Sequence, residues 1–191
     1  MDILFKKKPV EIIKQINEKA YQAGFKNKVY FVRLFDSKKE LINYVENLKY
    51  LKNCGVLLPK TIYVDKKLCL LFQEYIDGQN ALELISNGPL DEAYYKSIFN
   101  IAFRNKYEGI LLDYSPNNFK LIKGKLLYLS CFYKKYEEKQ NFVNTQIKLW
   151  FYTKELVNYL ESKNLPVDHS RLKEEYETNK ELVLATIKYY M

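Results

Sequence analysis

The chain is poor in the residue types that mark several protein classes. Among its 191 residues are 3 cysteines, 1 histidine, 1 tryptophan, 6 glycines and 5 prolines. Cys54, Cys69 and Cys131 are odd in number, widely spaced and set among apolar neighbours, so we expect neither a disulfide framework nor a zinc site. No repeat or low-complexity linker interrupts the chain, which predicts an ordered protein with one compact domain or two lobes.

Long hydrophobic runs are also missing. No stretch reaches the roughly 18 uncharged apolar residues that a transmembrane helix needs. The first five residues, Met1 to Phe5, precede Lys6, Lys7 and Lys8, so the positive charges lie on the wrong side of the apolar residues for a secretory signal. We therefore expect a cytoplasmic protein without a transmembrane segment.

Positive charge is concentrated in the first third of the chain. The net charge is +8, and residues 1–60 hold 13 Lys+Arg against 6 Asp+Glu, a net charge of +7. Such a field can attract an acidic protein partner. Only three of the 31 basic residues are arginines, whose forked side chain is favoured by readers of phosphate and base edges, so we do not expect nucleic acid to be the partner.

The first half of the chain reads as strands around one helix. Residues 38–53 repeat apolar side chains at helical spacing after a possible N-cap at Asp36–Ser37. Residues 11–25 fit either an amphipathic helix or two strands broken near Asn17–Lys19, and periodicity does not decide between them. The other predicted strands are residues 28–35, 61–64 and 68–75.

The second half reads as mostly helical with one hairpin. The predicted helices are residues 81–85, 91–107, 143–162 and 170–190. Two short strands, residues 119–122 and 125–129, turn at Lys123–Gly124. Trp150 is expected to pack in the helical core.

The polar loop from Gly109 to Phe119 carries the chemistry. Asp113 and Asn118 lie five positions apart around Pro116, a spacing used in phosphoryl transfer to hold a hydroxyl group and a metal ion together. The carboxylate would accept the hydroxyl proton and the amide oxygen would bind magnesium. The alternative is an ordinary turn in which Asp and Asn satisfy local backbone groups.

This loop resembles the Asp-x-x-Pro-x-Asn loop of the protein-kinase-like superfamily, in its RIO-like, lipopolysaccharide-core-kinase-like and aminoglycoside-phosphotransferase-like branches. Residues 46–60 are similar to the helix C segment of these branches, and residues 70–78 to their strand and hinge. The resemblance implies an α+β, two-lobed fold. Residues 1–75 would form a small β-rich N-lobe with helix 38–53, and residues 76–191 a reduced helical C-lobe with the catalytic-like loop 111–119 and hairpin 119–129.

The resemblance also assigns roles to residues and favours two strands over residues 11–25. It implies ATP and Mg²⁺ as cofactors, with Asp113 as catalytic base and Asn118 as metal ligand. Arg33 with Glu46 could equally be an ion pair that stabilises the lobe. The residues that would contact the nucleotide are Lys19, Arg33, Glu46, Glu74 and Tyr75.

Several positions depart from the family pattern. Asn17 and Lys19 stand where the phosphate-covering loop has glycines, and Leu111–Leu112 replaces the residues that usually precede the catalytic aspartate. Ser130 stands at the expected position of the metal-binding aspartate, and a neutral hydroxyl does not replace a carboxylate as a ligand of a hard cation. We therefore expect a pseudokinase or nucleotide-binding interaction module. The alternative is an active atypical ATP-dependent kinase that acts on a small molecule, an envelope sugar or a protein.

Overall fold

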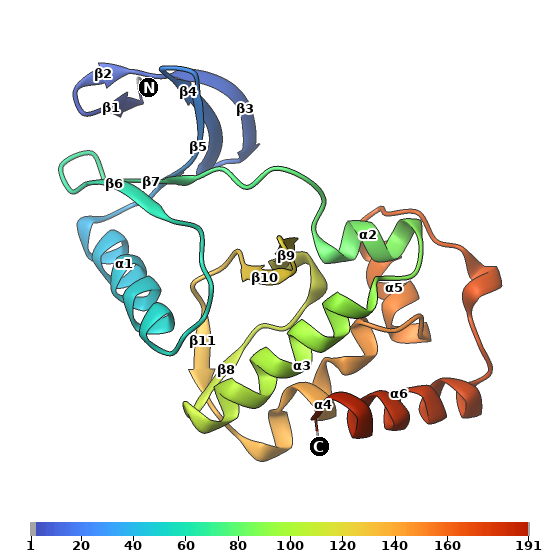
Figure 1. Cartoon of the computed structure of the whole chain (residues 1–191). Helices are drawn as coiled ribbons and strands as arrows, with labels where there is room; N and C mark the ends of the chain where they lie inside the picture. Colours follow the sequence, from blue (N-terminus) through green and yellow to red (C-terminus); the bar gives the residue numbers. More distant parts are fainter. Residues whose placement is uncertain (1–2, 191) are drawn as a thin grey trace. The chain divides into compact units, whose positions relative to one another are not determined.

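The computed structural model describes residues 3–190, and the chain divides into two compact units. One unit ends at Asp77 and the other begins at Gly78. The first unit is rich in strands and has one main helix, whereas the second is largely helical and carries a β-hairpin (Figure 1). The predicted α+β fold class is therefore confirmed.

The first unit is built on a five-stranded antiparallel sheet with the strand order β3-β4-β5-β7-β6. Two strands, broken at Glu18–Lys19, occupy the region that periodicity left open, so the two-strand interpretation is confirmed. A short hairpin of β1 and β2 precedes the sheet. The strands are β1 (Leu4–Phe5), β2 (Lys8–Pro9), β3 (Glu11–Asn17), β4 (Ala20–Phe25), β5 (Lys28–Leu34), β6 (Thr61–Asp65) and β7 (Leu70–Glu74).

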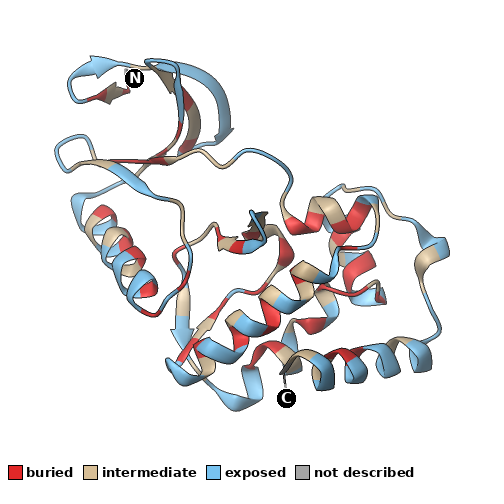
Figure 2. Cartoon of the chain, viewed as in Figure 1, coloured by how far each residue is buried: buried red, intermediate tan, exposed pale blue. Residues whose placement is uncertain are grey.

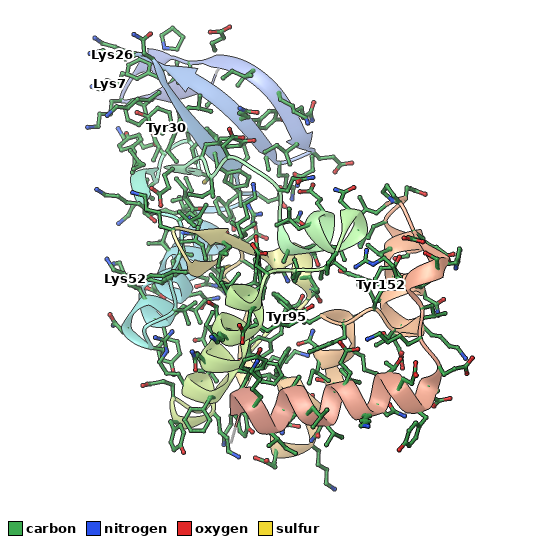
Figure 3. All side chains as sticks on the ribbon, turned by 45° about the vertical axis from the view of Figure 1, so that its right-hand side comes forward. Lys7, Lys26, Tyr30, Lys52, Tyr95 and Tyr152 are labelled. Carbon is green, nitrogen blue, oxygen red and sulfur yellow. The ribbon has the colours of Figure 1, made fainter. Side chains whose placement is uncertain are left out.

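One face of this sheet is covered by an aromatic cluster. Alternate residues of a strand point to the same face, which places Tyr30 and Val32 of β5 beside Phe72 of β7. Phe5 lies on these residues, with its ring centroid 5.1 Å from that of Phe72 and 5.4 Å from that of Tyr30. Tyr30 is labelled in Figure 3. Phe5 therefore fixes the short N-terminal hairpin to the sheet.

Helix α1 (Lys38–Asn53) packs through one side only, as the alternating colours of Figure 2 show. Its buried side carries Leu41, Tyr44, Leu48 and Leu51. At its start, the Ser37 hydroxyl accepts a hydrogen bond from the backbone N–H of Glu40 at 3.2 Å. This N-cap satisfies an N–H group that has no acceptor within the helix. The predicted helix 38–53 is confirmed at both ends.

The second unit begins with helices α2 (Ala81–Asn87) and α3 (Glu92–Tyr107). Strand β8 (Ile110–Leu112) follows and pairs with β11 (Tyr133–Lys135), a pairing that periodicity did not predict. Between them, β9 (Phe119–Ile122) and β10 (Lys125–Tyr128) form the predicted hairpin. Lys123 and Gly124 make its turn with positive φ angles of 50° and 75°, which suits the type I′ turn of a two-residue hairpin.

The helix predicted over residues 143–162 is wrong in its first half. The chain instead forms the short helix α4 (Phe142–Thr145), a 3₁₀ turn at Ile147–Leu149, and then α5 (Lys154–Ser162). Thr153 ends the interruption, because its hydroxyl donates to the carbonyl of Lys148 at 2.8 Å and caps α5 by accepting from the N–H of Leu156 at 3.1 Å. Side-chain bonds of this kind compete with a continuous helix.

The last predicted helix starts later than expected. Residues His169–Arg171 form a 3₁₀ turn, and α6 runs over Glu175–Tyr190. Asp168 makes this turn, since its carboxylate accepts hydrogen bonds from the backbone N–H and the hydroxyl of Ser170. Helix α6 packs on α3.

The composition-based expectations can be compared with residues 3–190. The three cysteines are free, and Cys54 and Cys131 are buried. Over the described residues, no helix is both long and apolar enough to cross a membrane.

Candidate functional site

The polar loop of the second unit begins where β8 ends. Asp113 directly follows this strand, whose Ile110 and Leu112 are buried. Pro116 then starts a 3₁₀ turn (Pro116–Asn118), because its fixed φ angle suits the first position of a helical turn. One backbone hydrogen bond closes the turn, from the N–H of Asn118 to the carbonyl of Ser115 at 2.9 Å. A second joins the turn to the end of the hairpin, from the N–H of Leu129 to the carbonyl of Asn118 at 2.8 Å. The loop is thereby tied to the hairpin.

The carboxylate of Asp113 is held by three donors. Its Oδ1 accepts hydrogen bonds from the hydroxyl of Ser115 at 2.6 Å, from the backbone N–H of Ser115 at 3.1 Å and from Nε2 of Gln146 at 2.9 Å. Partial burial acts to raise the pKa of Asp113, but the hydrogen bonds from Ser115 and Gln146 outweigh it and hold the pKa below its usual value. Asp113 is therefore ionised at neutral pH.

Gln146 is the residue that sequence reasoning missed. Besides binding Asp113, its Oε1 accepts a hydrogen bond from the backbone N–H of Tyr114 at 2.9 Å. It lies in the break between α4 and the following 3₁₀ turn, which the sequence pattern predicted as continuous helix. Nothing local distinguished Gln146 from its polar neighbours Asn144, Thr145 and Lys148, and no sequence pattern indicated a partner more than thirty positions away.

The loop is anchored from behind by buried aromatic residues. Trp150 is fully buried, and its Nε1 donates a hydrogen bond to the carbonyl of Tyr114 at 2.7 Å. The Trp150 ring also packs edge-on against Phe119, with centroids 5.7 Å apart. The hydroxyl of Tyr114 accepts a hydrogen bond from Asn105 of α3 at 3.0 Å. Trp150 is therefore buried as predicted, and these contacts join it to the loop and to β9.

Asn118, the predicted metal ligand, faces its own loop. Its Nδ2 donates to the backbone carbonyl of Asp113 at 3.3 Å, and its Oδ1 accepts from Asn117 at 3.3 Å. Asn117 is held in turn by the hydroxyl of Tyr159, which donates to its Oδ1 at 2.7 Å. Asp113 and Asn118 are therefore brought together as predicted, through a side-chain-to-backbone bond.

The loop presents a single carboxylate to a cation, and the metal-binding role of Asn118 stays a prediction. Magnesium prefers charged oxygen ligands in octahedral geometry, and Asp113 is the one carboxylate between Gly109 and Phe119. Over residues 3–190, no group of three or more His, Cys, Asp or Glu side chains is placed to hold a metal ion. Ser130, at the expected position of the second carboxylate, accepts a long hydrogen bond of 3.4 Å from the backbone N–H of Phe132.

A pocket of about 670 Å³ opens beside Asp113 within the second unit. Asp113, Gln146 and Phe132 are among the residues that line it. Phe132 is 65% exposed. An ionised carboxylate next to an apolar ring suits a hydroxyl or ammonium group attached to an apolar body.

The five predicted nucleotide contacts all lie in the first unit, and the structure gives several of them other partners. Lys19 forms an ion pair with Asp36, and Glu74 accepts a hydrogen bond from the backbone N–H of Lys60 at 2.7 Å. The Arg33 guanidinium lies 5.0 Å from the ring centroid of Tyr44 and 5.6 Å from that of Phe31.

Glu46 and Tyr75 complete this set. Glu46 is exposed on α1, two positions beyond Tyr44, and forms no ion pair with Arg33 or any other residue in the described part of the chain. Tyr75 follows β7 and is half-buried. The predicted pairing of Arg33 with Glu46 is not present, and the nucleotide-binding role of the five residues stays a prediction.

Comparison with known proteins gives a distant likeness. No protein-family model and no curated protein matches the chain. Among solved structures, the chain is similar to choline kinase LicA from Streptococcus pneumoniae, with a TM-score of 0.46 and 17% sequence identity. The match covers 93% of this chain and 80% of that chain.

Proposed function

We propose that this chain is a kinase-like domain that has lost magnesium-dependent phosphoryl transfer and works as a pseudokinase, that is, as a nucleotide-binding or interaction module. The supporting observation is that Asp113 is the one carboxylate in the loop 109–119, with Ser130 at the position where the resemblance expects a second acid. Asp113 and Asn118 lie close together, because the Asn118 side chain donates a hydrogen bond to the backbone carbonyl of Asp113.

The missing carboxylate matters because the metal neutralises charge that develops on the transferred phosphoryl group. Losing that stabilisation raises the barrier by several kcal/mol, and each ~1.4 kcal/mol is a factor of ten in rate. A chain with Ser130 at this position should therefore transfer phosphate very slowly. Asp113 alone can still orient a hydroxyl or ammonium group, because its carboxylate is ionised and held by Ser115 and Gln146.

The direct test is thermal unfolding of the purified chain with ATP, in the presence of magnesium or of a chelator. A ligand that binds the native state raises its stability by mass action, so the melting temperature reports binding. We expect no magnesium-dependent shift in the natural chain. Ser130→Asp restores the missing acid and should produce such a shift, which Asn118→Ala should then abolish.

The matched control for Ser130→Asp is Ser37→Asp. Ser37 caps α1 in the first unit, and aspartate caps a helix as well as serine does, so this variant adds the same charge without a new metal ligand. If Ser130→Asp gains no more than Ser37→Asp, Ser130 does not occupy the metal position. If the natural chain transfers phosphate from ATP with magnesium and Asp113→Asn abolishes the transfer, the chain is an active kinase and the proposal is wrong.

A further inference from the structure

A second concave surface lies within the first unit, and Glu46, one of the five predicted nucleotide contacts, is among the residues that line it. It has a volume of about 720 Å³ and runs between α1 and the segment that leads from Val56 into β6. We call it the α1–β6 groove. Ile42, Val45, Leu57 and Val64 provide apolar lining, and Leu57 is 44% exposed. Apolar surface in a concave site is a common mark of ligand or peptide binding.

The helical side of the groove is a continuous stripe. Ile42, Val45, Lys49 and Lys52 recur at intervals of three or four residues, so they share one face of α1. Glu46, four positions after Ile42, lies on the same face. This face adjoins the buried side of the helix but is distinct from it. From Ile42 to Lys52 the helix advances by ten residues, which is a rise of about 15 Å at 1.5 Å per residue. The groove is therefore long enough for an extended segment of about four or five residues.

Lysines surround this apolar floor. Lys49 and Lys52 come from α1, and Lys60 and Lys66 from the facing segment. All four are exposed, and none forms an ion pair with another residue of the described chain. Glu46 is the one acidic residue that lines the groove. Figure 3 shows Lys52 extending outward from α1. The rim thus carries uncompensated positive charge.

We propose that the α1–β6 groove docks a short acidic peptide segment that carries one or two apolar side chains. Carboxylates of the segment would meet the lysine rim and its apolar side chains would enter the floor, so charge and shape select the same partner. An anionic membrane surface would engage exposed lysines without needing a concave apolar floor. The proposal rests on the proposed function as an interaction module and names its partner, but the groove lies in the first unit and is tested without Asp113.

Selection from a phage-displayed library of random peptides on the immobilised full chain tests this inference. Enriched peptides would be synthesised with a fluorescent label, and their affinity measured by anisotropy. We expect enriched sequences to combine several Asp or Glu residues with Phe, Leu or Ile. Raising the ionic strength should weaken their binding, because salt screens exposed charges.

Three variants locate the binding surface. Lys49→Glu/Lys60→Glu reverses two rim charges and should weaken binding about tenfold or more. Val45→Ser removes an apolar contact without changing the charge and should also weaken binding. Lys14→Glu/Lys28→Glu is the control, because it makes the same charge change at exposed positions of β3 and β5. Its affinity should stay within about twofold of the natural chain, since distant surface charges act weakly. Circular dichroism would verify that each variant is folded.

The other outcomes contradict the proposal. Failure to enrich acidic peptides, or equal binding by the natural chain and the Lys49→Glu/Lys60→Glu variant, would exclude an acidic peptide from the groove. Binding to phosphatidylserine vesicles that the rim variant loses, without peptide enrichment, would make the groove a membrane-contact surface instead. Either result leaves the proposed loss of phosphoryl transfer untouched, because that loss is tested through Ser130 and Asp113.

Discussion

Replacing Gln146 by methionine tests whether this side chain holds the candidate loop in place. Methionine has a similar length and volume but cannot form the two hydrogen bonds that Gln146 makes with Tyr114 N–H and the Asp113 carboxylate. The Tyr114 N–H is partly buried, and leaving it without an acceptor costs about 1–2 kcal/mol. The bond to Asp113 is exposed, so water replaces much of it and its loss adds about 0.5–1 kcal/mol.

We therefore expect Gln146→Met to lower the free energy of unfolding of the second unit by about 1.5–3 kcal/mol. Urea unfolding followed by Trp150 fluorescence is the assay, since Trp150 is the single tryptophan and binds the carbonyl of Tyr114. With a urea dependence of about 2 kcal/mol per molar, the midpoint should fall by about 0.75–1.5 M.

Gln140→Met is the matched control for this change. Gln140 also lines the pocket beside Asp113, but its exposed side chain makes no hydrogen bond to the described residues. Surface changes of this kind stay within about 0.5 kcal/mol. If Gln146→Met unfolds at the same urea concentration as Gln140→Met, Gln146 does not hold the loop and the network around Asp113 has been read wrongly.

Three further predictions concern the same unit. Trp150→Phe should lower the free energy of unfolding of the second unit by about 2–4 kcal/mol, measured by circular dichroism. The substitution removes the hydrogen-bond donor to the Tyr114 carbonyl and opens a cavity beside Phe119. A loss below about 0.5 kcal/mol would contradict this account. Gly124→Ala should lower the free energy of unfolding by about 1 kcal/mol, measured by thermal unfolding, because φ is +75° at this position. Gly88→Ala is the control and should be neutral, because φ is 173° there and no atom lies within 4 Å of the added carbon. The pKa of Asp113 is lower in the folded chain than its ordinary value of 3.8, so the ionised carboxylate contributes its full stabilisation above that pH and loses it as the pH falls through the lower folded value. Asp113→Asn should therefore reduce the loss of stability at acid pH, measured as the free energy of unfolding against pH. An unchanged acid dependence would contradict this expectation.

Local patterns predicted the elements whose stability is local. Helix 38–53 carries its own N-cap at Ser37 and a full apolar face, and the 119–129 hairpin carries its own turn residues. The pattern failed over residues 143–162, where the apolar spacing is helical but the side chain of Thr153 binds the backbone of Lys148 instead. It also missed β8, because three residues are too few to show a period and the strand depends on pairing with β11.

The candidate site was predictable only as far as its motif. Asp113 and Asn118 lie within one loop, so their spacing in sequence already places them close together. Gln146 and Trp150 reach that loop from more than thirty positions away, and only the packing of the second unit brings them there. The lysine rim of the α1–β6 groove was visible in sequence only as a basic first third, since the lysines converge through the packing of α1 beside β6.

The strand order of the first unit bears on how it folds. Strands β3, β4 and β5 pair with their neighbours in sequence, so their hairpins can form within about 10 μs. The next ladder joins Leu34 of β5 to Leu70 of β7, and it closes a long chain segment that contains all of α1 and β6. The entropy of closing this segment must be overcome before the ladder stabilises the sheet. The rate at which the unit folds should therefore depend on the β5–β7 contacts, above all on Val32 and Phe72, more than on the edge strand β3.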